Sequence, residues 1–518
     1  MTTTNCCKKE CKITNCLEKA LFWLSVIAIT FSPTQVSIIG KFTPSDLALI
    51  FAAIVWVVLL IIKRDRLMLP PISNWVFAAI ITFSIIGIVA ALAPESIHAI
   101  KAPEMLIQIK DGVKQAITQD IAKIIIYLII GVGIYRSAFT DHQRIRIATY
   151  GLLIGVTFAV SLGVFQRIQL KNHYQPERQK RVVFANNFDR LSDEEKVTFE
   201  QDKKKVIMGM WKIDESGNNI FTPCSKYKAY LTAETPIQVC STFGSWSDHG
   251  YMPSRFGYCA FLALALPLLL ILLASESIIW IRLWIALVIA SAGVSFMAGY
   301  LFPALIAGLI FASILLKDKN RIFACGITAA LIIISIIPWH NRKEIFTEPY
   351  QMTVNQADSD YYYEGKPALK KIWGEQQSAL NSLRSSPLYG SGPATFGEIA
   401  GRSYDTMGDL EKQRLEPDAH SGYLITAIQS GILGLAALFM ILGFYFGNAI
   451  KTIKTDYNLW VIASCGAILA LIFLLLFTYP MVRGTGTLLA MIMGIIASGE
   501  TLALKKRIIN NISNGEEQ

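Results

Sequence analysis

The chain consists of long apolar runs separated by polar connections. Runs of about 18 or more apolar residues recur along the sequence, and a helix of that length crosses a hydrocarbon core of about 30 Å. This pattern predicts an all-α polytopic membrane protein with about 12 transmembrane helices. The expected spans are 18–38, 44–62, 74–94, 121–138, 145–166, 254–274, 278–296, 299–316, 321–338, 420–447, 457–480 and 484–504.

The composition agrees with this class. Of the 518 residues, 53% are hydrophobic and 17% are charged, whereas a soluble domain of this size carries more charge. The first apolar run, from about Leu21, follows a polar, basic head without a small-residue cleavage site. We therefore interpret this run as the first span and not as a signal peptide.

Lysine and arginine gather in alternate connections. With 12 spans, all of these basic connections fall on one side of the membrane, which the positive-inside rule makes cytoplasmic. We therefore expect a multi-pass protein of the bacterial inner membrane with both termini in the cytoplasm. The net charge of +10 partly reflects this bias, and no basic–aromatic motif points to nucleic acid. The basic residues are Lys8, Lys9, Lys12, Lys63, Arg64, Arg66, Arg136, Arg144, Arg146, Lys317, Lys319, Arg321, Lys451, Lys454, Lys505, Lys506 and Arg507.

Two long segments lack apolar runs, and the same alternation places both in the periplasm. Each contains many aromatic residues, which favours folded loops over disorder. The predicted organisation is N-terminal helices with a cytoplasmic head (1–166), a first large periplasmic loop (167–253), four central spans (254–338), a second large periplasmic loop (339–419), and three C-terminal spans with a cytoplasmic tail (420–518).

The cysteines divide by location. Cys224 and Cys240 share the first long loop, where an oxidising periplasm favours a disulfide. We expect three further cysteines, inside spans, to be core residues: Cys259, Cys325 and Cys465. Those of the N-terminal head are Cys6, Cys7, Cys11 and Cys16, whose spacing contains no C-x-x-C pair; reduced or acylated thiols are favoured there over a zinc site.

The spans lack a charged residue near their centres, and the two halves show no internal repeat. Both features count against an ion-coupled transporter. The long external loops instead favour chemistry at the outer membrane face.

The stretch "DAHSGYLITAIQSGILG" at 418–434 contains the first candidate site. We expect Asp418 to cap the helix start and His420 to project from the first turn. Gly431 and Gly434 form a small-x-x-small pair that lets another helix or a lipid chain approach closely. An interfacial histidine with ordinary packing glycines is the alternative interpretation.

A second stretch lies upstream, "KKIWGEQQSALNSLRSSPLYGSGPATFGEIAG" at 370–401. It predicts an amphipathic helix through Trp373, followed by a turn fixed by Pro387, Gly390, Gly392 and Pro393. Glycine-rich turns of this kind can present backbone N–H groups to anions. A simple loop reversal is the alternative. A D-x-D pattern at 358–360 lacks any supporting framework, so we interpret it as solvated loop and expect no metal site.

Together these two stretches resemble the O-antigen ligase and polymerase family. The family signature is a basic residue near a tryptophan, an N-P-L-x-G-x-G-P-like turn, then H-N-x-Y-L with E-x-G-x-x-G. Here the corresponding pieces are Lys370 and Trp373, "SSPLYGSGPATF" and "HSGYLITAIQSGILG", in the same order. The resemblance covers about residues 370–440. The chain departs from the signature at Ser421, where asparagine is usual, and at Gln429, where glutamate is usual.

The resemblance implies transfer of a glycan from undecaprenyl diphosphate to an acceptor hydroxyl at the periplasmic face, without a cofactor. It implies that His420 is the general base, since its pKa near neutrality suits that role. The turn glycines Gly390 and Gly392 are expected to contribute to substrate binding. Cations would neutralise the diphosphate, and the candidates are Lys370, Lys371, Arg255 and Arg483.

Several activities fit this resemblance. A ligase, which we place first, passes the finished glycan to lipid A-core sugar, and a polymerase joins lipid-linked repeats. A protein O-oligosaccharyltransferase is a third member of the superfamily. From another class, a lipid-linked glycan flippase or exporter would not need His420.

Overall fold

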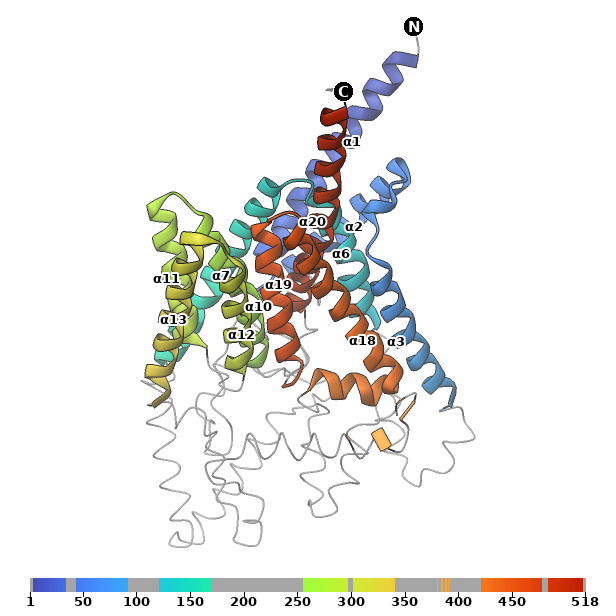
Figure 1. Cartoon of the computed structure of the whole chain (residues 1–518). Coiled ribbons are helices and arrows are strands. Elements are labelled where there is room, and N and C mark those ends of the chain that lie inside the picture. Colours follow the sequence, from blue (N-terminus) through green and yellow to red (C-terminus); the bar gives the residue numbers. More distant parts are fainter. Residues whose placement is uncertain are drawn as a thin grey trace, which may run out of the picture.

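The computed structural model describes residues 3–33, 43–91, 121–169, 255–296, 301–340, 421–477 and 483–515, and six positions between 380 and 390. Within these ranges the secondary structure is helical and contains no strand. Figure 1 shows the helices gathered into one bundle. They are α1 (Thr3–Thr30), α2 (Pro44–Lys63), η1 (Arg66–Met68), α3 (Ile72–Ala91), η3 (Ile124–Gly131), α6 (Val132–Ala138), α7 (His142–Gln169), α10 (Arg255–Ser275), α11 (Ile279–Ser295), α12 (Phe302–Leu315), α13 (Asp318–His340), α18 (Gly422–Thr455), α19 (Leu459–Leu474) and α20 (Arg483–Gly515).

Each predicted span overlaps an apolar helix among the described residues. Among the described residues, 6 helices are long and apolar enough to cross a membrane, and six shorter apolar helices accompany them. The described part of the chain is therefore all-helical and holds 6 candidate membrane-spanning helices, and the full set of 12 spans remains a prediction. The region 278–316 forms two separate helices, α11 and α12, as the sequence indicates.

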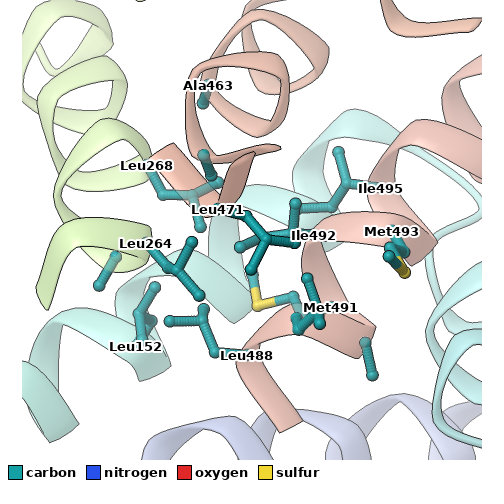
Figure 2. Close-up of a cluster of buried hydrophobic side chains, with 14 of the residues drawn as sticks. Leu152, Leu264, Leu268, Ala463, Leu471, Leu488, Met491, Ile492, Met493 and Ile495 are labelled. Carbon is teal, nitrogen blue, oxygen red and sulfur yellow. The ribbon is translucent and has the colours of Figure 1, made fainter. Parts of the chain in front are cut away.

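The centre of the bundle is formed by α7, α10, α19 and α20. Helix α10 is apolar all round and almost completely buried along its length, as expected of a helix enclosed by others. Figure 2 shows Leu152, Leu264, Leu471 and Leu488 converging from these four helices, with Met491 beside them. Side chains on α2, α3 and α11 that face away from this core are largely hydrophobic and exposed, which is the pattern of a lipid-facing surface.

Close packing between α12 and α19 depends on two glycines. A β-carbon on Gly308 would lie 2.8 Å from the carbonyl oxygen of Gly466, and one on Gly466 would lie 2.7 Å from that of Gly308. The two backbones therefore touch directly, as small residues permit in membrane bundles.

The basic connections lie at one end of the bundle. Lys63, at the end of α2, pairs with Glu18 in the middle of α1. Arg136 donates to the carbonyl oxygen of Leu69 at 2.6 Å. Figure 1 shows α1 beginning and α20 ending at this same end.

At this end α7 is joined to the connection between α10 and α11. The Arg146 guanidinium lies 2.9 Å from the carboxylate of Glu276, and the Tyr150 hydroxyl donates to the same carboxylate. The Glu276 side chain is only 1% exposed. Burial works to raise the pKa of Glu276, but hydrogen bonds from the Ile278 N–H, Tyr150, Arg146 and the Ser277 N–H outweigh it and lower the pKa to about 2.

The cysteines follow the prediction in part. Cys259 and Cys465 are buried, as expected of core residues. Cys325 is exposed, so its assignment to the core was wrong: it lies on the outer face of α13. Cys16 is an exposed free thiol. Cys224 and Cys240 lie outside the described residues.

Candidate functional site

A sharp bend in α18 defines the candidate site. Gly431 has φ 64° and ψ −163°, inside a helix that is otherwise regular, and this backbone region is essentially open only to glycine. The bend divides α18 into a short limb (422–430) and a long limb (432–455). Figure 1 shows the short limb lying across the end of the bundle and the long limb running through it. The sequence predicted a single uninterrupted span at 420–447.

The short limb is tied to the end of α19. Ser421 is the N-cap of α18, and its hydroxyl accepts from the Leu424 N–H. The same hydroxyl donates to the carbonyl oxygen of Leu475 at 3.2 Å. The Tyr423 N–H donates to that carbonyl at 3.3 Å, and its hydroxyl donates to the carbonyl of Ile472 at 2.9 Å. These four bonds fix the direction in which α18 begins.

The start of α18 corrects two expectations, the cap at Asp418 and the place of His420 in the first turn. Because Ser421 is the cap, the capping role expected of Asp418 belongs to Ser421. Position 420 precedes the cap in sequence and does not belong to the first turn, which begins at Gly422. The side chains of Asp418 and His420 themselves lie outside the described residues.

The second candidate stretch meets α18 at the bend. The carbonyl oxygen of Pro387 accepts a hydrogen bond from the Ile432 N–H at 2.9 Å. Gly390 is buried and has φ 77°. A β-carbon on Gly390 would lie 2.3 Å from the carbonyl oxygen of Ile428 and 2.7 Å from the Gly431 nitrogen. We call this backbone contact between the turn (Pro387, Leu388 and Gly390) and residues 428–432 the turn dock.

The turn dock changes the role expected of the glycine pair. At Gly431 the close neighbour is the backbone of the turn. The sequence had predicted another helix or a lipid chain at this place. A β-carbon on Gly434 would lie 2.3 Å from the β-carbon of Ser430, so Gly434 makes room for the fold-back of its own helix. The Ser430 side chain is fully buried, and its hydroxyl oxygen finds no hydrogen-bond partner among the described residues.

Two of the four proposed cations belong to the same end of the bundle. Arg483 is the first residue of α20, which follows the end of α19 where the short limb is bound. Arg255 is the first residue of α10. The opposite end of α10 is followed by Glu276, which pairs with Arg146 at the end of the bundle that carries the basic connections. Both helices therefore begin at the end opposite the basic connections, where α18 bends.

The remaining predicted site residues are Lys370, Lys371, Trp373 and Gly392, and all lie outside the described residues. Within the ranges that the structure covers, no group of three or more His, Cys, Asp or Glu side chains could hold a metal ion. The described part of the site therefore consists of backbone, glycines and hydroxyl groups that shape the end of the bundle.

Sequence reasoning missed three features of the site: the cap at Ser421, the contact of Tyr423 with α19, and the bend at Gly431. Tyr423 also stacks on Phe439 across the bend, with ring centroids 5.3 Å apart. An S/T residue just before an apolar run signals a cap, and Ser421 is closer to the run than Asp418. No known protein family matches the chain, and a search of curated proteins found no match.

Proposed function

We propose that this protein is an inner-membrane glycosyltransferase that moves a glycan from an undecaprenyl-diphosphate carrier to an acceptor hydroxyl. Its proposed acceptor is lipid A-core sugar, as in an O-antigen ligase. One observation supports this above others: the turn dock brings together the two stretches whose motifs resemble that family. The contacting residues Pro387 and Ile432 lie more than 40 positions apart in sequence. If the resemblance of each stretch were accidental, the two stretches would have no reason to touch.

The proposed orientation follows from charge. The basic connections lie together, and the positive-inside rule makes that end cytoplasmic. The bend of α18, the turn dock and the first residues of α10 and α20 then belong to the periplasmic end. This is the side on which a lipid-linked glycan donor and a lipid A-core acceptor meet.

In the proposed reaction the acceptor hydroxyl oxygen attacks the anomeric carbon of the donor. The bond between that carbon and the diphosphate oxygen breaks, and undecaprenyl diphosphate leaves with the bonding electrons. His420 takes the hydroxyl proton. Lys370, Lys371, Arg255 and Arg483 are the cations proposed to neutralise the leaving diphosphate.

The test is a His420→Ala substitution in the native host beside a full deletion, with lipopolysaccharide run on a gel and lipid-linked glycan extracted in parallel. His142→Ala is the matched control, because His142 is exposed at the start of α7, at the opposite end of the bundle. We expect His420→Ala to leave bare core and to strand long glycan on the carrier, while His142→Ala gives a normal ladder.

Other outcomes assign other functions. Core carrying a single repeat would identify a polymerase, and glycan missing from protein alone would identify a protein O-oligosaccharyltransferase. A normal ladder for His420→Ala beside a defective deletion would contradict the catalytic histidine and favour a flippase or exporter. A silent deletion would contradict the proposed transfer to lipopolysaccharide altogether.

A further inference from the structure

The turn dock is a contact of backbone with backbone. The Ile432 N–H reaches Pro387, and the backbone of Gly390 lies against the backbone of residues 428–431. The three atoms nearest to a β-carbon built on Gly390 all belong to the backbone of residues 428–431. The fit therefore depends on the absence of a β-carbon at Gly390 and on the left-handed backbone of Gly431.

The dock also sets a distance. Gly431 is nine helical positions beyond Gly422, a rise of about 14 Å, and the two residues back to position 420 add at most about 7 Å. The turn is therefore held within roughly 21 Å of position 420. The short limb that separates them is itself fixed to α19 by Ser421 and Tyr423.

We infer that Gly390 and Gly431 are positioning residues, which lock the turn of the second long segment onto α18 in one register. This inference rests on the proposed function. The locked register holds Pro387, Leu388 and Gly390 against residues 428–432, so that the turn gives a fixed backbone surface to the end of the bundle where donor and acceptor are proposed to meet. The dock stays closed during the reaction and is not a lid.

Two substitutions at Gly390 distinguish the need for its positive φ angle from the need for space at its β-carbon position. Asparagine adopts left-handed φ values more readily than alanine, yet its β-carbon would also meet the Ile428 carbonyl oxygen. We expect both Gly390→Asn and Gly390→Ala to lower glycan transfer by about a hundredfold, because a displacement of 1 Å can cost that much. Gly443→Ala and Gly447→Ala on the long limb are the matched controls, since nothing lies within 4 Å of a β-carbon there. Their transfer is expected to stay within about twofold of the wild type.

A cysteine pair tests the dock without reference to activity. Pro387→Cys and Ile432→Cys place thiols on two exposed residues whose backbones share a hydrogen bond of 2.9 Å. Oxidation in native membranes is expected to give a 387–432 linked peptide by mass spectrometry, which distinguishes it from links among native cysteines. Adding Gly390→Asn is expected to abolish this link while the amount of protein in the membrane is unchanged.

The linked protein then decides between positioning and gating. Oxidised membranes are supplied with undecaprenyl-diphosphate-linked glycan from the deletion strain, and transfer is measured before and after reduction. Equal transfer in both states supports a fixed dock. Loss of transfer in the oxidised state, or a Gly390→Asn variant with normal transfer, would overturn the inference. If the link forms but the deletion strain has no transfer defect, the proposed function fails and the dock itself stands.

Discussion

The carbonyl oxygen of Pro387 lies 2.9 Å from the backbone nitrogen of Ile432, a residue more than 40 positions later in the chain. In a straight helix the Ile432 N–H would donate to the carbonyl of Ile428. Here that carbonyl faces Gly390 instead. The bend frees the N–H of Ile432 from its place in the helix, and the turn supplies the carbonyl oxygen that pairs with it.

The first prediction concerns the bend itself. Gly431→Ala forces a β-carbon into a backbone region that alanine avoids, so we expect a loss of about 1–3 kcal/mol in the free energy of unfolding, or a straightened helix that releases the turn. Gly443→Ala, on the same helix, is expected to change stability by no more than about 1 kcal/mol, in the stabilising direction. Thermal unfolding in detergent measures both, and equal effects would contradict the special role of Gly431.

The sequence predicted where helices lie much better than how they bend. Apolar length alone locates the helices, because a membrane requires about 20 apolar residues for each span. Gly431 carried no comparable signal, since glycine is common in straight membrane helices. Its bend depends on the turn at Pro387, which no local pattern reveals.

Local sequence patterns also could not predict which side chains are exposed or which distant residues pair. Cys325 lies in an apolar run like Cys259 and Cys465, yet it faces outward because of which helices surround α13. The pairing of Arg146 with Glu276 joins residues 130 positions apart. The motifs of the candidate site were visible in sequence, but their contact was not.

A second prediction addresses the crossing of α12 and α19. Gly466→Val would place a side chain where the carbonyl oxygen of Gly308 already lies 2.7 Å from a β-carbon. The helices must move apart, and we expect a loss of about 1–3 kcal/mol from overpacking. Gly326→Val on α13 is the control, because nothing lies within 4 Å of its β-carbon. An unfolding temperature lowered equally by both variants would show that packing at this crossing is not the cause.

A third prediction concerns a buried polar link between three helices. The Asn74 amide donates to the carbonyl of Leu128 in η3 at 2.7 Å, and its carbonyl accepts from the Tyr445 hydroxyl of α18 at 2.9 Å. Tyr445→Phe removes the donor to the Asn74 side-chain carbonyl, and we expect the free energy of unfolding to fall by about 1 kcal/mol. Asn74→Leu breaks both bonds and leaves the Tyr445 hydroxyl buried, which is expected to cost about 2 kcal/mol.

Thr149→Val is the matched control for this link. Thr149 is equally buried, but its hydroxyl donates only to the Ile145 carbonyl of its own helix at 2.9 Å, so its loss is expected to cost less than about 0.5 kcal/mol. Chemical unfolding of the purified protein in detergent ranks the three variants. An order with Thr149→Val as the most damaging would contradict the proposed importance of the interhelical bonds.

A fourth prediction concerns the buried carboxylate of Glu276. Arg146→Ala removes the cation beside a carboxylate that is 1% exposed, but the Arg146 side chain itself is 42% exposed to screening solvent and Tyr150 still donates to Glu276. We therefore expect a loss of about 1–2 kcal/mol in the free energy of unfolding. The pair of Glu18 and Lys63 is the control: both side chains are partly exposed, so Glu18→Gln is expected to cost less than about 1 kcal/mol. Both effects are measured as shifts in the unfolding temperature at neutral pH.

The same carboxylate predicts a pH dependence. The pKa of Glu276 falls from 4.5 to about 2 in the folded protein, so the unfolded chain binds the proton more readily. The stability that this shift contributes is complete above pH 4.5 and is lost as the pH falls from 4.5 toward about 2. The difference in unfolding temperature between the wild type and Glu276→Gln should therefore be constant from neutral pH down to about 5 and shrink below it. A difference that shrinks above pH 6, or that grows on acidification, would show that Glu276 is not held as a carboxylate by Arg146 and Tyr150.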